Sequence, residues 1–488
     1  MSLKIVVISD THYSRQGDTS ARRISIADTL LLRAVHRLNR FIKPDLVVLL
    51  GDLIDNGSGK KSQEERRHIM DIISKLDCRV AVIPGNHDGD IDRFYDVFPD
   101  PGEQFDVNGV RFVVFNDPEE PHYNASRTNA DIQRMHAARS NYDGPLVALQ
   151  HVPLFKPGTS ESPYSYLNIG EAWDAFEKND YMLSISGHWH PGDDQIARNA
   201  GRTIIAPALC EGSFPFIEVN IDGEQIVTRR HELHMPRELE LVDYHVHSQY
   251  AFCSENMEMS KALHLSREMG LAGMAFTEHS GQLYYDADTF WHAGFMEKGI
   301  ETIDGASNRM QNYLSDIKAV SPPAYVGLEI DCDYNGNPVV RPEDFEHIQI
   351  RVGTIHWIEE LFKPEPDMDK VCEEMLGRLS RFFACGIQTL AHPFRVFRNN
   401  GASISPILTA KLVALLKAEN VAAEINFHTQ ETTAEFVKAC VESGVKLAFG
   451  SDSHNLYEVG EFYPHLELLK ECEYGYSDLP EILADFRL

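Results

Sequence analysis

The chain of 488 residues is too long for one ordinary hydrophobic core, so its length predicts at least two domains. It has 45 lysines and arginines against 74 aspartates and glutamates, and the resulting formal charge of -29 argues against stable binding to nucleic acids or anionic membranes. Its eight cysteines include no Cys-x-x-Cys pair, which argues against a disulfide framework or a zinc ribbon. Because we recognise no secretion signal and no apolar stretch of membrane-spanning length, we expect a cytoplasmic protein.

The first half of the chain alternates apolar runs, typical of buried strands, with segments of helical periodicity. Helices are expected over 24–41 and 64–76. The expected strands are 4–9, 45–50, 79–84, 111–115, 146–150, 182–186 and 203–206. The alternation predicts an α/β layer, and the later strands, which come with fewer helices, predict a second sheet.

Almost every one of these strands ends in residues that can bind metal. The strand ends read Asp10-Thr-His12, Gly51-Asp52, Gly85-Asn-His-Asp88, His151 and Gly187-His-Trp-His190. Each motif alone has a structural explanation, because the glycine motifs are good turn sequences and a lone histidine is usually a hydrogen-bonded structural residue. Together they supply the carboxylate, amide and imidazole ligands that two neighbouring divalent ions need, including one carboxylate to bridge them.

A charged stretch over 229–240 predicts a boundary between domains 1–235 and 240–488, after a hairpin turn at 220–224. Strands and helices then alternate regularly. The expected strands are 241–245, 273–277, 325–329, 348–353, 388–392, 422–426 and 446–450, and the expected helices are 260–269, 310–319, 368–385, 406–419 and 433–443. Seven such units in a row favour a barrel over an open sheet, with functional groups at the carboxyl ends of the strands.

The strand ends of the second half also present metal-binding residues. They are His245 and His247, Glu278 and His279, Glu329, His356, His392, and Asp452 with His454. Side chains two residues apart at a strand end point to the same side, so His245 and His247 can bind one ion. Glu329, Asp331 and Asp333 share one strand face, and of these we select Glu329 as the ligand.

The five motifs of the first half resemble those of the calcineurin-like metallophosphoesterase superfamily, and the Gly-Asn-His-Asp and Gly-His-x-His motifs resemble its cyclic-nucleotide phosphodiesterase branch. The resemblance covers residues 1–235 and implies a two-sheet α/β sandwich with two metal ions. It implies that Asp52 bridges them, that His87 faces the phosphate or protonates the leaving oxygen, and that Asp88 fixes His87 or another histidine. The implied ligands are Asp10, His12 and His190 for one ion, and Asn86, His151 and His188 for the other.

The second half resembles the polymerase and histidinol phosphatase (PHP) family, whose fold is a distorted (β/α)7 barrel with up to three metals. Gly353-Thr-Ile-His356 and Gly450-Ser-Asp-Ser-His454 make it similar to the histidinol-phosphatase-type members. The implied ligands are His245, His247 and Asp452 for a first ion, His356 and His392 for a second, His279 and His454 for a third, and Glu329 as the bridge between the first two.

Two features of the second half leave alternatives open. Members of this family usually offer histidine or aspartate six residues after the second histidine, and this position is Cys253, with Glu255 two residues further on. Either residue completes the third site, or Cys253 is a buried structural cysteine, which we prefer from the sequence. Arg395 and Arg398 either bind a substrate phosphate or are exposed helix arginines.

The sequence therefore predicts a bifunctional metal-dependent phosphoesterase that hydrolyses small phosphodiesters, phosphomonoesters or both in two separate sites. The alternative is a single histidinol-phosphatase-like activity with the other metal domain regulatory. The cofactors are expected to be manganese, iron or zinc, two in the first half and two or three in the second. His87, Asp52 and Glu329 are the candidate catalytic residues, and a small phosphorylated substrate is the expected partner.

Overall fold

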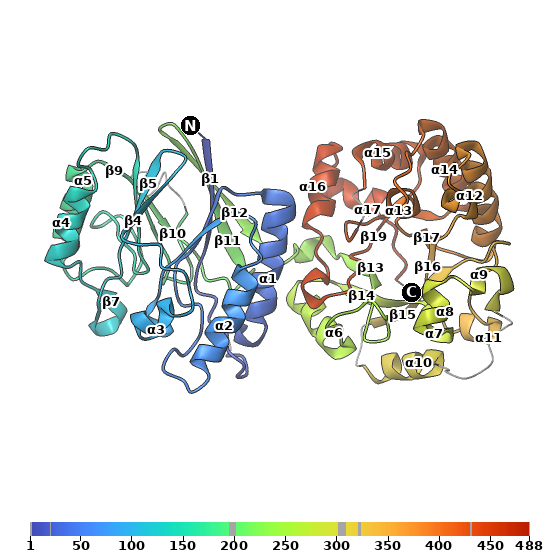
Figure 1. The fold of residues 1–488 in the computed structure, drawn as a ribbon, viewed down its shortest axis with the longest axis horizontal. Helices are drawn as coiled ribbons and strands as arrows, with labels where there is room; N and C mark the ends of the chain where they lie inside the picture. The colour runs from blue at the N-terminus through green and yellow to red at the C-terminus, as the bar shows by residue number, and fades with distance from the viewer. Residues whose placement is uncertain are drawn as a thin grey trace. The chain divides into compact units, whose positions relative to one another are not determined.

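The computed structural model describes residues 2–19, 21–194, 202–300, 309–320, 324–429 and 432–487. The chain divides into two compact units, Met1–Leu233 and His234–Leu488, a division that adjoins the domain limits expected from the sequence. Figure 1 shows the elements of both units. Among the described residues, no helix combines the length and the apolar character needed to cross a lipid bilayer.

The N-terminal unit is an α/β sandwich of two five-stranded sheets, as expected. The first sheet has the order β12 (Gln225–Glu232), β11 (Pro215–Asp222), β1 (Ser2–Ile8), β2 (Leu46–Leu49) and β3 (Arg79–Val82). The second has the order β10 (Thr203–Ile205), β9 (Tyr181–Ser186), β8 (Leu146–Leu149), β5 (Val110–Val114) and β4 (Gln104–Val107). The helices are α1 (Ala27–Arg37), α2 (Ser62–Ile73), α3 (Ile91–Tyr95), α4 (Asn129–Ala137) and α5 (Ile169–Lys178).

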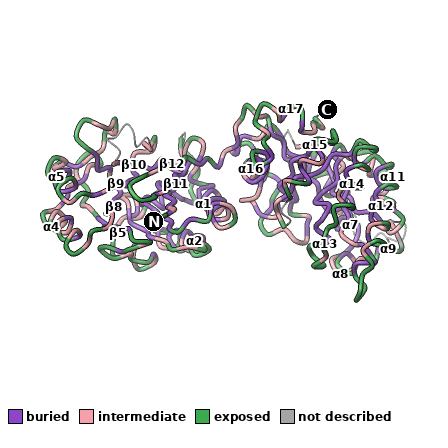
Figure 2. Tube along the Cα trace, turned by 90° about the horizontal axis from the view of Figure 1, so that it is seen from above, coloured by how far each residue is buried: buried purple, intermediate pink, exposed green. Residues whose placement is uncertain are grey.

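The main core of this unit lies between the two sheets. It joins alternate residues of β1, such as Ile5 and Val7, to residues of the second sheet such as Phe112 and Leu183. The opposite face of the second sheet packs on α4 and α5 through a cluster that includes Trp173. Both faces of the central strands are thus buried, which is why these strands read as continuous apolar runs (Figure 2).

Parallel pairing brings the carboxyl ends of the strands together at one edge. In the first sheet Ile8 pairs with Leu49, and the backbone continues this alignment as Asp10 donates to the Gly51 carbonyl at 3.1 Å. In the second sheet Leu149 pairs with Ile185, and the Gly187 amide donates to the His151 carbonyl at 2.9 Å. The register of each sheet therefore places two ligand motifs side by side.

The C-terminal unit is a seven-stranded parallel sheet that closes into a barrel. The strands pair in chain order: β13 (Val242–Val246), β14 (Gly273–His279), β15 (Ala324–Asp331), β16 (Ile350–Thr354), β17 (Thr389–Leu390), β18 (Ala422–Ile425) and β19 (Leu447–Phe449). Beyond β19, Asp452 donates its amide to the His245 carbonyl at 2.7 Å, and Val246 forms a parallel bridge with Ser453. These contacts link the last strand to the first and confirm the distorted (β/α)7 barrel.

Twelve α-helices of the C-terminal unit lie within the described residues (Figure 1). They are α6 (Met259–Glu268), α7 (Ser280–Tyr284), α8 (Ala287–Trp291), α9 (Phe295–Lys298), α10 (Arg309–Ala319), α11 (Pro342–Phe345), α12 (Met368–Phe383), α13 (Arg395–Asn399), α14 (Pro406–Glu419), α15 (Ala434–Ser443), α16 (Tyr463–Glu471) and α17 (Leu479–Ile482).

Two boundary predictions differ from the structure. The charged stretch 229–240 begins inside β12, which is amphipathic and continues the β11 hairpin to Glu232. The strand expected over 388–392 pairs only over β17, because the chain turns into the left-handed region at His392, where φ is 25°. The turn at 220–224 is confirmed, with Asp222 paired to Gln225 across it.

Candidate metal centres

Three predicted ligands of the N-terminal unit converge at the edge of its first sheet. Asp10, His12 and His190 offer ligand atoms that all lie within 4.8 Å of one another. The Nε2 atoms of His12 and His190 are 3.3 Å apart, and the Oδ1 atom of Asp10 lies 3.5 Å from His190 Nε2. These two nitrogens and one carboxylate oxygen form the first predicted ligand set.

Asp52 lies between this set and the second one. Its Oδ2 atom is 3.7 Å from His12 Nε2 and 3.4 Å from His151 Nε2. Asn86 Oδ1 and His188 Nδ1 lie 3.2 Å and 3.1 Å from His151 Nε2. One oxygen of Asp52 therefore faces both ligand sets, which is the position that a bridging carboxylate requires.

The remaining ring nitrogens of the four histidines contact groups that orient the rings. His190 Nδ1 lies 2.7 Å from Glu211 Oε1, and His12 Nδ1 lies 3.4 Å from Asp55 Oδ1. His151 and His188 instead donate to the backbone carbonyls of Leu50, at 2.6 Å, and Tyr123, at 2.9 Å. Such contacts fix the tautomer of a ligand histidine and aim the other nitrogen at the ion.

His87 lies beside the ligands on a cleft. Its Nδ1 atom donates to the Asp55 carbonyl at 2.8 Å, which leaves Nε2 as the nitrogen available to substrate. Asp88 was predicted to fix His87 or another histidine, and this prediction was wrong. Its carboxylate accepts hydrogen bonds from the backbone amides of Leu53, Ile54 and Gly85, and the structure shows none between it and a described histidine. It fastens two motif loops together, and burial raises its pKa to about 7.

Several proposed ligands sit at strained backbone positions. Asp10, His12, Asp52 and His188 have φ between 49° and 67° in the N-terminal unit, and Asp452 has φ of 54° in the C-terminal one. Side chains other than glycine seldom adopt this left-handed conformation, although aspartate and histidine tolerate it better than most. Strain of this kind concentrates at functional sites, where the surrounding contacts enforce it.

In the C-terminal unit, Glu329 lies at the centre of the predicted ligands. Its Oε1 atom is 2.9 Å from His392 Nε2 and 3.5 Å from His356 Nε2. Its Oε2 atom is 3.5 Å from His245 Nε2 and 3.6 Å from His247 Nε2. Oε1 thus faces one pair of histidines, whereas Oε2 faces His245, His247 and also His279, whose Nδ1 lies 2.6 Å away, so Glu329 is placed to bridge ions.

Asp452 completes the group around the first pair. Its Oδ1 atom lies 3.0 Å from His247 Nε2 and 3.5 Å from His245 Nε2. Glu424, which no sequence motif indicated, places its Oε1 atom 2.6 Å from His245 Nδ1. Asp331, for which no role was predicted, places its Oδ1 atom 2.8 Å from His356 Nδ1.

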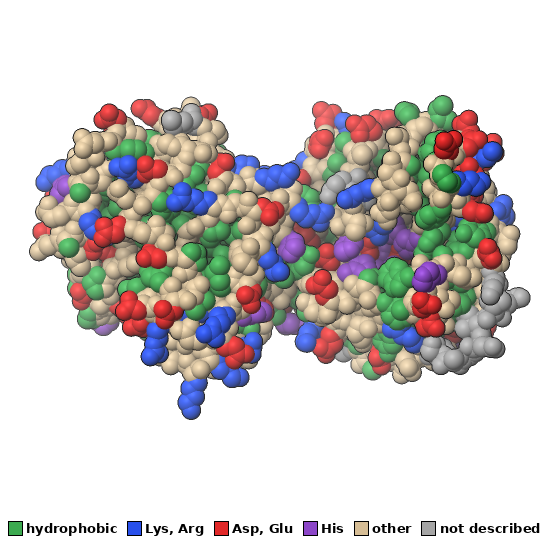
Figure 3. All heavy atoms as spheres, in the orientation of Figure 1, with side chains coloured by type: hydrophobic (Ala, Val, Ile, Leu, Met, Phe, Trp, Pro, Cys, Tyr) green, Lys and Arg blue, Asp and Glu red, His purple; other side chains and the backbone are tan. Residues whose placement is uncertain are grey.

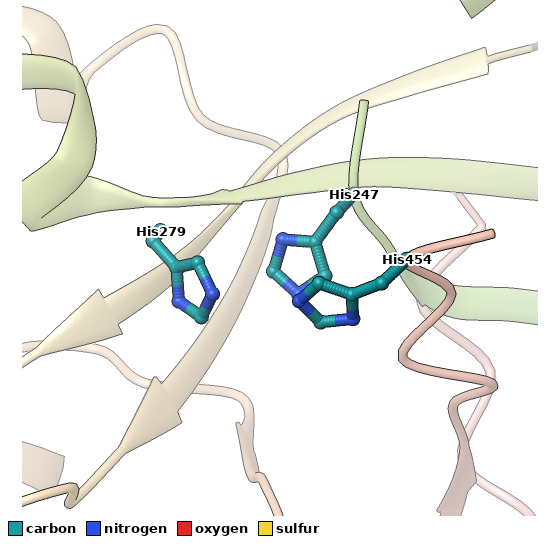
Figure 4. A group of neighbouring side chains, drawn as sticks. All are labelled: His247, His279 and His454. Atoms are coloured by element: carbon teal, nitrogen blue, oxygen red, sulfur yellow. The ribbon is translucent and has the colours of Figure 1, made fainter. Parts of the chain in front are cut away.

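His247 also belongs to a third group, together with His279 and His454 (Figure 4). The three imidazoles come from three different segments of the barrel, and their ligand atoms lie within 4.8 Å of one another. In Figure 3 histidine side chains gather in a hollow of this unit. The structure thus brings His279 and His454, the two residues proposed for the third site, close together, and the closeness of His247 to them was not expected.

Cys253 lies next to this third group. Its Sγ atom is 3.7 Å from His279 Nε2, and burial, which raises the pKa of the thiol, is outweighed by His279, so the pKa lies below its ordinary value. Glu255 is exposed, and its Oε2 atom accepts a hydrogen bond from Asn455 Nδ2 at 2.6 Å. The side chain of Cys253 therefore contacts the third group, whereas Glu255 reaches His454 only through its backbone amide, which donates to the His454 carbonyl at 3.0 Å.

The two candidate phosphate-binding arginines differ in position. Arg395 is buried, and its Nη2 atom donates to Asp452 Oδ2 at 2.6 Å and to Asn426 Oδ1 at 3.2 Å. Arg398 is exposed on the same short helix. Arg395 therefore orients a predicted metal ligand, and Arg398 lies at the surface.

Both groups of residues fit divalent cations. Buried atoms without a hydrogen-bond partner include Asp10 Oδ1 in the first unit and His245 Nε2 in the second. Burial alone would raise the pKa of Glu329, but His279, His245 and His356 hold it well below its usual value. Ionised carboxylates and unpartnered nitrogens converging in a buried site are what a bound cation would satisfy.

Two family models match the chain. Residues 3–192 match the model of calcineurin-like phosphoesterases, and residues 243–428 match the model of the PHP domain.

Similar proteins are known for parts of the chain. It is 37% identical over 84 residues to a "probable glycerophosphodiester phosphodiesterase GpdQ" of Arcobacter nitrofigilis, a match that covers 17% of this chain and 29% of that protein. It is 24% identical over 217 residues to a "probable cyclic nucleotide phosphodiesterase" of Coxiella burnetii, covering 43% and 84% of the two chains. A dimetal phosphatase structure from Danio rerio superposes with a TM-score of 0.41 at 15% identity, covering 47% of this chain and 96% of the other.

The family matches coincide with the two halves in which the candidate centres lie. The chain therefore joins a calcineurin-like phosphoesterase domain to a PHP domain, the domain content of a hydrolase that acts on phosphoric esters.

Proposed function

We propose that the two units hydrolyse different phosphoric esters, the N-terminal unit phosphodiesters and the C-terminal unit phosphomonoesters. The carrying observation is that each unit places one buried carboxylate, Asp52 or Glu329, between two sets of ligand atoms. Bound manganese, iron or zinc ions, two in the first unit and two or three in the second, would lower the pKa of a water molecule and polarise the phosphoryl group.

In the N-terminal unit, His87 is the proposed general acid. It lines a cleft of 440 Å³ together with Asp52 and Asn86, and its Nδ1 is tied to the Asp55 carbonyl. A proton on Nε2 would pass to the oxygen of the departing alcohol, which stabilises the leaving group. The names of the relatives from Arcobacter and Coxiella, both phosphodiesterases, support diester hydrolysis here.

In the C-terminal unit, support for monoester hydrolysis comes from the resemblance of its motifs to histidinol-phosphatase-type members. A phosphodiester opened in the first unit yields a monoester, which is the substrate class of the second. The fusion would then perform two consecutive hydrolyses, each consuming one water and releasing first an alcohol and then phosphate together with a second alcohol.

The test compares the full-length, manganese-loaded protein with Asp52→Asn and Glu329→Gln, using bis(p-nitrophenyl) phosphate and p-nitrophenyl phosphate. Asp52→Asn is expected to abolish diester cleavage, and Glu329→Gln to abolish monoester cleavage. Glu435→Gln, at an exposed position of α15, is the matched control. If either variant in a proposed bridge retains wild-type rates on both esters, the two-activity proposal is wrong and the single-activity alternative replaces it.

A further inference from the structure

A second cleft also borders the N-terminal centre. It has a volume of 450 Å³ and is lined by Asn86 and His188, which also line the cleft that contains His87. Tyr123 lines both. We call the cleft of 440 Å³ that contains His87 the His87 cleft. We call the cleft of 450 Å³, which is lined by Asn116, the Asn116 cleft.

Tyr123 is held between the two clefts by the backbone around it. It follows the short strand β6 (Glu119–Glu120), and both His122 and Tyr123 have φ in the left-handed region, at 63° and 61°. Its carbonyl accepts the Nε2 proton of His188 at 2.9 Å, which ties this turn to a predicted metal ligand. Tyr123 as a whole is 56% exposed, so it belongs to the walls of the two clefts and not to the core.

The two clefts differ in their chemistry. The His87 cleft contains Arg22 and the proposed acid His87. Among the described residues that line the Asn116 cleft there is no lysine or arginine, while Asp90 and Glu119 lie on it with apolar groups such as Ile91. Its acidic lining repels an anion and favours a neutral or cationic group.

A phosphodiester needs two such spaces, because its two ester substituents leave phosphorus in different directions. The departing alcohol must lie near the general acid, and His87 lines only the cleft named after it. The retained substituent must then lie elsewhere around the same phosphate. Resting on the proposed diesterase function, we propose that the Asn116 cleft binds the retained substituent and selects neutral or cationic alcohols.

The test uses diesters with a common p-nitrophenolate leaving group and different retained groups. In p-nitrophenyl phosphorylcholine the retained group is cationic, and in methyl p-nitrophenyl phosphate it is small and neutral. In 2-carboxyethyl p-nitrophenyl phosphate the retained group is anionic. The expected order of kcat/KM is choline, methyl, carboxyethyl. Because the leaving group is constant, this order reports only the site of the retained group.

Glu119 and Glu120 provide a matched pair, since they are neighbours in β6 and only Glu119 lines the cleft. We expect Glu119→Lys to lower the choline-to-carboxyethyl ratio of kcat/KM about fivefold to tenfold, the range of a partly exposed charge contact reversed in sign. Glu120→Lys should leave that ratio within twofold of the wild-type value.

Filling the cleft gives a second, steric test. Ile91 lines it and is 43% exposed, so Ile91→Trp adds bulk without disturbing a buried position. The choline-to-methyl ratio should fall about tenfold, whereas Leu167→Trp, at an exposed position outside both clefts, should not change it. If Glu119→Lys and Glu120→Lys change their kcat/KM ratio equally, the assignment of the cleft is overturned. The same holds if Ile91→Trp and Leu167→Trp change theirs equally. If the wild-type protein cleaves none of the three diesters, the diesterase proposal itself is overturned.

Discussion

Glu424 connects ligands of two proposed metal positions, so its replacement tests the C-terminal centre directly. It lies in β18 and is 2% exposed. Oε1 lies 2.6 Å from His245 Nδ1, and Oε2 accepts the His392 amide at 2.9 Å and the Asn426 Nδ2 proton at 3.0 Å. Glutamine keeps the shape of the side chain but has only one oxygen. Its NH2 group must therefore face a hydrogen-bond donor, either His245 Nδ1 or the His392 amide.

The expected size of the effect follows from this geometry. Loss of a carboxylate behind a ligand histidine typically weakens metal binding 10-fold to 100-fold. Because Glu424 is buried and orients ligands of two ions, we expect the upper end, about 100-fold or about 2.7 kcal/mol, for Glu424→Gln. Glu211 is 26% exposed in its side chain and, of the predicted ligands, the structure shows it in contact with His190, so Glu211→Gln should weaken metal binding at the N-terminal centre about 10-fold.

Isothermal titration calorimetry of the metal-stripped full-length protein with manganese measures both effects, and Glu435→Gln is the surface control. The metal-induced rise in Tm provides a second readout, since weaker binding gives less stabilisation at a fixed metal concentration. A Glu424→Gln variant that binds manganese within twofold of the wild-type affinity would refute this expectation, and so would a larger loss of affinity in Glu211→Gln than in Glu424→Gln. Burial and shared contacts would then not determine how much metal affinity is lost.

Four further predictions concern separate features. Cobalt-loaded protein should show a sulfur-to-metal charge-transfer band in the near ultraviolet that Cys253→Ser removes and Glu255→Gln retains, and a band unchanged in Cys253→Ser would exclude the thiolate from the third site. Gly187→Ala should destabilise the N-terminal unit in urea unfolding by about 1–3 kcal/mol, because the added Cβ would lie 1.8 Å from Ser9 Oγ and 2.9 Å from Asp10 Oδ2. Burial lowers the pKa of His465 from its ordinary value of 6.5 to about 4. Between these two pH values the imidazole is protonated in the unfolded chain but not in the folded chain. Stability should then fall by up to about 3 kcal/mol from pH 6.5 to 4, and the Tm of His465→Asn should fall less over this range. Plasma mass spectrometry should find both N-terminal ions lost in Asp52→Asn but one C-terminal bridged ion retained in Glu329→Gln, and equal losses would contradict the bridging geometry described here.

The strands and the ligands on them were predictable because the information is local. A buried parallel strand is a continuous apolar run, and functional residues follow its carboxyl end, so Asp10, Asp52 and His151 could be proposed as ligands from their places after such runs together with the resemblance of their motifs. The pairing register then brings these ends together without further information from the sequence. The helices of the barrel were predictable for the same reason, from their periodicity.

The residues behind the ligands could not be found in this way. Glu424 is 179 positions from His245 along the chain, and its strand reads as any other buried run. Tyr123 acts through its carbonyl, which every residue has, so no side-chain pattern marks it. Asp88 was misassigned because an aspartate in a turn can accept amides or orient a histidine, and only the folded loops decide between them.

The two proposed bridging carboxylates, Asp52 and Glu329, differ in the contacts of their second oxygen. Asp52 Oδ1 accepts the His87 amide at 2.7 Å, so only Oδ2 remains for both ligand sets. Asparagine must then turn its NH2 group either toward that amide or toward both ions. Glu329 faces His392 with Oε1 and faces His245 and His279 with Oε2, so glutamine can keep its oxygen on one of these two sides. Because of the backbone amide beside Asp52, we therefore expect the proposed N-terminal bridge to tolerate substitution less well than the proposed C-terminal one.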